Sequence, residues 1–132
     1  MLFETNKDKG SAGMALAIAY FGATGYTINI PLNDTQWYDF VIEKNGKFET
    51  VQCKATGSKN GRIDFRSTGG TKGNVYDVLT NYSLDCLFCI HQYGIMFCIP
   101  GSELPQTTGF NLRTTPTVNK QGFQTYKYIV KI

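Results

Sequence analysis

The chain has 132 residues, of which 42% are hydrophobic, 14% aromatic and only 17% charged. These values exclude an intrinsically disordered chain and predict a single domain that spans residues 1–132. The formal net charge of +3 permits an acidic partner without requiring one. No apolar stretch approaches the ~18 residues of a membrane span, and the polar start MLFETNKDKG is unlike a signal peptide, so we expect a cytoplasmic protein with no membrane partner.

The first predicted elements are a helix and a short strand. Residues 6–21 carry apolar side chains at i, i+3, i+4 and i+7, which predicts a helix with one apolar face. These side chains belong to Met14, Ala17, Ile18 and Phe21. Residues 26–30 then alternate between polar and apolar types, which predicts a strand that ends before Pro31.

Asn45-Gly46 is the strongest turn signal in the chain, because both residues accept the positive φ of a type I′ turn. It predicts a β-hairpin made of strands 37–43 and 47–55. The elements expected after it are a strand over 62–66, a polar loop over 67–74, a short helix over 75–82, a hairpin of strands 85–91 and 95–99, and strands within 110–113 and 123–132. This order predicts a mixed α/β domain with a central sheet.

The chain contains one histidine, His91, which argues against multi-histidine metal sites and most histidine-dependent hydrolases. We expect His91 in the core or at its rim. Cys86 and Cys89 have the CxxC spacing of zinc and redox sites, but strand positions three apart point to opposite faces. We therefore expect free, buried thiols. A zinc or redox site that also includes Cys98 is the alternative.

The residues on the first hairpin that could take part in catalysis are Asp39, Gln52 and Lys54. Alternation places Gln52 and Lys54 on one face of the return strand. Asp39 precedes the turn, and a small stagger or a bulge would bring it to the same end of the hairpin. Carboxylate and amide oxygens both ligate Mg²⁺, and a lysine can activate water or stabilise charge on a phosphate. An ordinary solvent-exposed hairpin would account for the same spacing.

Residues 31–42, 46–48 and 51–54 together resemble the PD-(D/E)XK nuclease superfamily. They are closest to the branch of group I intron-associated homing endonucleases and related phage enzymes, in which a Q-x-K sequence often ends the motif. Gly10 and Gly13 in the first predicted helix, and residues 97–100 downstream, are also similar to this branch. No single motif is specific, so the resemblance rests on the ordered set.

The resemblance implies a restriction-endonuclease-like α/β core, in which a mixed central β-sheet is flanked by helices. It also implies a Mg²⁺-dependent endonuclease that hydrolyses DNA phosphodiester bonds, with Mn²⁺ as a second candidate cofactor. By the same resemblance Asp39, Gln52 and Lys54 are the catalytic residues. The metal ligands would be Asp39, Gln52 and the main-chain carbonyl of Cys53.

One position departs from the family pattern. The first helix of the family usually carries a glutamate that completes the metal site, and the corresponding residue here is Met14. Three interpretations follow: a natural variation with retained activity, an inactivating substitution made for study, or a natural loss of catalysis. In packing terms, Met14 simply continues the apolar face of the helix.

Basic residues gather directly after the motif. They are Lys59, Arg62, Arg66 and Lys72. These side chains are candidate contacts to DNA phosphates, although a solvated strand followed by an ordinary polar loop would have the same composition.

Double-stranded or branched DNA is therefore the expected partner, in a bacterial or phage-infected host cell. A chain of this length has little surface for reading a long target site, so we expect a homodimer or homotetramer. Two alternatives remain open. One is a Holliday junction or branched-DNA resolvase of the same fold, and the other is a catalytically degenerate DNA-binding module, which Met14 would explain.

Overall fold

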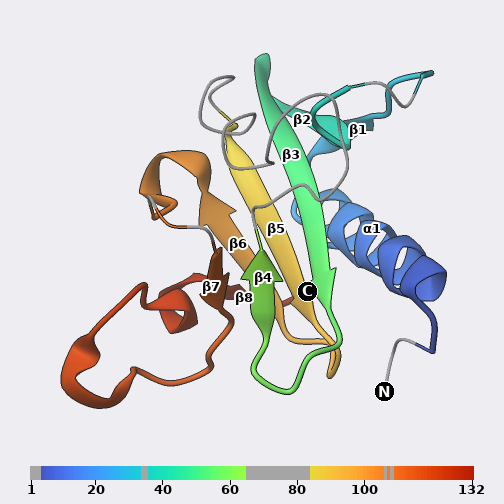
Figure 1. The fold of residues 1–132 in the computed structure, drawn as a ribbon. Coiled ribbons are helices and arrows are strands. Elements are labelled where there is room, and N and C mark those ends of the chain that lie inside the picture. The colour runs from blue at the N-terminus through green and yellow to red at the C-terminus, as the bar shows by residue number, and fades with distance from the viewer. Residues whose placement is uncertain (1–3, 34–35, 65–83, 106, 108) are drawn as a thin grey trace.

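The computed structural model describes residues 4–33, 36–64, 84–105, 107 and 109–132 (Figure 1). The predicted loop over 67–74, the predicted helix over 75–82, and the candidate DNA contacts Arg66 and Lys72 lie outside these residues. Among the described residues, no helix is long and apolar enough to cross a membrane.

The helix predicted near the N-terminus is confirmed as α1, Asn6–Ala23. It begins where the hydroxyl of Thr5 accepts a hydrogen bond from the Asp8 amide at 3.0 Å, which is an N-cap of the usual kind. One face of α1 packs on the central sheet. Gly13 allows close approach there, since an added Cβ at this position would lie 3.2 Å from the Cβ of Ala55.

The central sheet has six strands in the order β1-β2-β3-β5-β6-β8. Among the strands that the structure describes, the β3–β5 pair is parallel and the other neighbours are antiparallel. The strands are β1 Thr27–Asn29, β2 Phe40–Lys44, β3 Lys47–Thr56, β5 Cys86–His91, β6 Met96–Pro100 and β8 Ile129–Val130. The predicted mixed α/β class is therefore confirmed.

The β2–β3 hairpin turns at Asn45 and Gly46, whose φ angles of 55° and 84° are those of the predicted type I′ turn. Pairing runs in register from Lys44↔Lys47 to Phe40↔Val51 without a bulge. The predicted start of the first strand at residue 37 is wrong, because β2 begins at Phe40. Asp39, the residue just before β2, still donates its amide to the Val51 carbonyl of β3 at 2.8 Å, and this contact forms part of the site described below.

Two hydrophobic clusters lie on opposite faces of the sheet. The helix-side cluster joins α1 to alternate residues of the strands, including Phe40, Val51 and Cys86. The far-side cluster contains strand residues whose side chains point to the other face of the sheet, including Leu87 and Cys89. Cys86 and Cys89 thus lie on opposite faces, as predicted, and all four cysteines are free.

A small second sheet covers the far side. Its strands are β4 Arg62–Asp64 and β7 Gly109–Asn111, paired antiparallel, and Figure 1 shows β4 in front of the central strands. Ile63 and Phe110 bring this sheet into the far-side cluster. Short 3₁₀ turns complete the described chain: η1 Gly101–Glu103, η2 Val118–Lys120 and η3 Thr125–Tyr128.

The strand predicted within residues 123–132 is largely wrong, since only Ile129–Val130 pair with β6. The physical reason is a buried polar contact. The hydroxyl of Thr125 accepts a hydrogen bond from the Arg113 amide at 2.7 Å and lies 3.2 Å from the Asn111 carbonyl oxygen. This contact holds residues 125–128 in a turn, and no local sequence pattern predicts it.

Candidate active site

Asp39 is attached to β3 by two hydrogen bonds. Its amide donates to the Val51 carbonyl at 2.8 Å, and its carboxylate Oδ2 accepts from the Cys53 amide at 2.6 Å. The Asp39 side chain therefore accepts a hydrogen bond from a β3 amide that has no backbone partner on β2. This is how the structure brings Asp39 beside the Gln52–Lys54 segment, with no bulge in the ladder.

The ionisation of Asp39 is governed by its half-buried position. Burial raises the pKa of Asp39 above its ordinary value, and the Cys53 hydrogen bond and the charge of Lys54 offset part of this effect. The negative charge of the Asp39 carboxylate is therefore only partly compensated by its surroundings. A bound cation would compensate it further.

Gln52 and Lys54 lie on β3, on the side of the sheet away from α1. Their parallel neighbours on β5 are Leu87 and Cys89, which belong to the far-side cluster. Both side chains are half-buried. The positive charge of Lys54 acts on Asp39, so the structure brings the three predicted site residues to one region.

The donor set suits a hard cation. Within the described part of the chain, no group of three or more His, Cys, Asp or Glu side chains could hold a metal ion. A metal site here would instead combine the Asp39 carboxylate, the Gln52 amide oxygen and the Cys53 carbonyl, which are all oxygen ligands of the kind Mg²⁺ takes. Burial, followed by the charge of Asp39, raises the pKa of the Cys53 thiol and so favours its protonated form.

Met14 belongs to the helix side of the sheet. It is half-buried and packs against the helix-side cluster, whereas Gln52 and Lys54 lie on the far side. Its packing therefore accounts for an apolar residue at this position.

One supporting contact escaped the sequence analysis. Oδ2 of Asp85 accepts from the Thr50 amide at 2.8 Å, and the Asp85 amide donates to the Thr50 hydroxyl at 3.2 Å. This reciprocal pair joins β3 to the segment that enters β5, two residues before Gln52. The partners are 35 positions apart in the chain, so no local signal could have revealed them.

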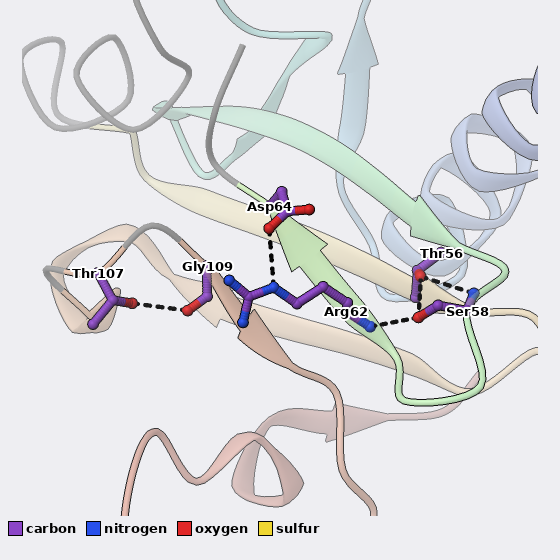
Figure 2. A network of polar contacts seen from close by, with 6 residues as sticks. All are labelled: Thr56, Ser58, Arg62, Asp64, Thr107 and Gly109. Atoms are coloured by element: carbon purple, nitrogen blue, oxygen red, sulfur yellow. Dashed lines mark hydrogen bonds and ion pairs between the residues drawn. The ribbon is translucent and has the colours of Figure 1, made fainter. Parts of the chain in front are cut away.

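The predicted DNA contacts Lys59 and Arg62 are both exposed. Figure 2 shows that Arg62 is engaged within the protein, since its Nε donates to Asp64 at 2.9 Å. In the same network the Ser58 hydroxyl accepts from the Arg62 amide at 2.8 Å and lies 3.1 Å from the Thr56 hydroxyl. The turn that carries Lys59 is therefore held by its own side chains.

This mixed sheet, with a helix on one face, an aspartate before its second strand and Q-x-K on its third, defines a restriction-endonuclease-like protein. Residues 4–128 match the family described as PD-(D/E)XK endonuclease, and the chain belongs to this family. The predicted resemblance is thereby confirmed.

A solved structure supports the same fold. The bacterial homing endonuclease I-Ssp6803I is similar to this chain with a TM-score of 0.67 and 18% sequence identity, over 95% of this chain and 87% of that chain. No curated protein sequence matches the chain.

Proposed function

We propose that this protein is a metal-dependent endonuclease that hydrolyses phosphodiester bonds in DNA. The observation that carries the proposal is the Asp39–Cys53 hydrogen bond, which holds a half-buried carboxylate beside Gln52 and Lys54. Membership of an endonuclease family and the likeness to a bacterial homing endonuclease support the same chemistry.

In this proposal Asp39, Gln52 and the Cys53 carbonyl hold Mg²⁺ or Mn²⁺. Such an ion, when bound, polarises the phosphate and lowers the pKa of a bound water. Lys54 adds a positive charge on the same side of the sheet, where it orients the attacking water and stabilises charge on the scissile phosphate. Half-burial of the site strengthens these interactions relative to bulk water.

The test compares plasmid cleavage by the wild type, Asp39→Asn and Lys54→Met, with Mg²⁺ or Mn²⁺ present. We expect each variant to lose about 10²-fold or more in rate, as removal of one stabilising group from an active site typically does. Lys47→Met is the matched control, since Lys47 is an exposed lysine on the same strand, with its Nζ 3.6 Å from the Glu49 carboxylate. Wild-type rates for Asp39→Asn and Lys54→Met would refute the proposal.

A catalytically degenerate DNA-binding module is the second candidate, and the apolar residue at position 14 favours it. Under this alternative the wild type binds DNA but cleaves none, whichever divalent ion is present. Under the first proposal the wild type itself cleaves DNA. A panel of linear, nicked and four-way-junction DNA also separates a homing-type enzyme from a branched-DNA resolvase, and sedimentation equilibrium tests the proposed homodimer or homotetramer.

A further inference from the structure

A cavity of about 690 Å³ opens at one end of the far side of the sheet. Three segments form its walls: the turn that carries Lys59, the β5–β6 turn with His91 and Tyr93, and the loop that contains Arg113 and Thr117. Its size is in the range of small-molecule and nucleotide sites. None of the residues predicted for catalysis lines it.

The chemistry of this cavity matches a nucleotide. Lys59 and Arg113 are the charged lining residues, and no described acidic side chain lines the cavity. Tyr93 is 70% exposed, and its ring stacks on the His91 ring with centroids 5.2 Å apart and an angle of 25°. An exposed aromatic face beside two cations provides a surface for a base and contacts for its phosphates.

Hydrogen bonds within the protein hold two of the three walls in place. The Leu112 amide donates to the Gly61 carbonyl at 2.8 Å and so joins two of the three segments. The Thr117 amide donates to the Gln124 side chain at 3.1 Å, and Gln124 Nε2 donates back to the Thr117 hydroxyl at 2.9 Å. A cavity with such walls loses little conformational entropy on binding.

The cavity and the candidate active site share one face. On the parallel strands β3 and β5, Lys54 pairs with Cys89, and two residues further Thr56 pairs with His91. Two residues of strand correspond to about 7 Å, which is close to two nucleotide steps at roughly 3.4 Å each. A DNA strand with a phosphate at Lys54 would therefore reach the cavity within a few nucleotides.

We propose that this cavity binds an unpaired nucleotide of the DNA, with its base stacked on Tyr93 and its phosphates near Lys59 and Arg113. This proposal rests on the proposed function. It makes the protein sensitive to unpaired bases close to the cut, in addition to the paired duplex.

The test uses full-length Asp39→Asn protein, which keeps the DNA intact. Fluorescence anisotropy measures its affinity for a duplex with one unpaired thymine and for the fully paired duplex of the same sequence. We expect a preference for the unpaired thymine, and we expect Tyr93→Ala to reduce this preference by about 5- to 150-fold, the usual contribution of one stacked base. Tyr93→Phe should keep it.

A control variant and an independent crosslinking measurement complete the test. Phe48→Ala removes another exposed aromatic ring, 65% exposed near the β2–β3 turn, and should leave the preference intact. Replacing the unpaired thymine by 5-iodouracil and irradiating should crosslink the base to Tyr93 in the unmutated pocket. This measurement does not depend on the folding of a Tyr93 variant.

Equal preference in Asp39→Asn and Tyr93→Ala/Asp39→Asn, or a crosslink at other residues only, would overturn the pocket assignment and leave the proposed nuclease function standing. Absence of any DNA binding or cleavage by the wild type would overturn both.

Discussion

Asp39 has two separable roles, and two substitutions at this position distinguish them. Its carboxylate accepts the Cys53 amide at 2.6 Å, and it also supplies the negative charge for a metal ion. Asp39→Ala removes both roles. Asp39→Asn keeps an oxygen that can accept the Cys53 hydrogen bond and removes only the charge.

The structure predicts opposite effects on stability. Asp39→Ala leaves a partly buried amide without its partner, which costs about 1–3 kcal/mol in the free energy of unfolding. For a domain of this size that corresponds to a fall in Tm of roughly 4–12 °C. Asp39→Asn should be as stable as the wild type or more stable at neutral pH, because burial disfavours the charge that it removes.

The pH dependence follows from the same raised pKa. Between the ordinary value of 3.8 and the raised value, the folded wild type binds more protons than the unfolded chain. The stability contributed by Asp39 is therefore complete below pH 3.8 and is lost as pH rises through the raised pKa. The advantage of Asp39→Asn over the wild type should grow through this window and then stay constant.

Thermal melting in EDTA across this pH range, repeated at neutral pH with Mg²⁺, measures both effects. Added Mg²⁺ should stabilise the wild type, because a ligand that binds only the folded state raises its stability, and it should not stabilise either Asp39 variant. Asp64→Asn, a substitution of an exposed carboxylate on β4, is the control. Equal destabilisation by Ala and Asn would refute the hydrogen-bond argument, and equal Mg²⁺ stabilisation of wild type and Asp39→Asn would refute the ligand assignment.

Other buried contacts give two further predictions. Thr125→Val leaves the Arg113 amide without its acceptor and should cost about 1–3 kcal/mol in urea denaturation, while a change below experimental error would show that the turn is held by packing alone. The hydrogen bond between Cys86 and Cys98, whose sulfur atoms lie 3.2 Å apart, lowers the pKa of Cys98, whereas burial raises the pKa of Cys89. Iodoacetamide should therefore alkylate Cys98 before Cys89 in the native protein, as followed by peptide mass spectrometry, and the reverse order would contradict this assignment.

Local sequence signals predicted the parts of the fold that depend on neighbouring residues. Asn45-Gly46 determined the turn, and the turn set the register of the hairpin, since both residues tolerate positive φ. Strand alternation then separated Cys86 from Cys89 onto opposite faces, and the same alternation placed Gln52 and Lys54 together.

The roles assigned to Asp39, Gln52 and Lys54 stay predictions. That the three side chains lie close together could be anticipated from the hairpin register. The exact position of Asp39 could not, because it depends on a side-chain contact in which its carboxylate accepts a hydrogen bond from the Cys53 amide. The role of Arg62 as a DNA contact also stays a prediction, and the structure adds that its Nε donates to Asp64.

The tertiary structure decided what depends on residues distant in the chain. The parallel β3–β5 pairing joins Thr50 to Asp85, and it aligns the candidate active site with the cavity beside Tyr93. The hydrogen bond of the Thr125 hydroxyl holds residues 125–128 in a turn, where the sequence predicted a strand. Turn conformation and side-chain alternation are set by bonds between near neighbours, which a sequence displays directly. A buried hydrogen bond or a cavity wall forms only when distant segments meet, and its energy appears in neither segment alone.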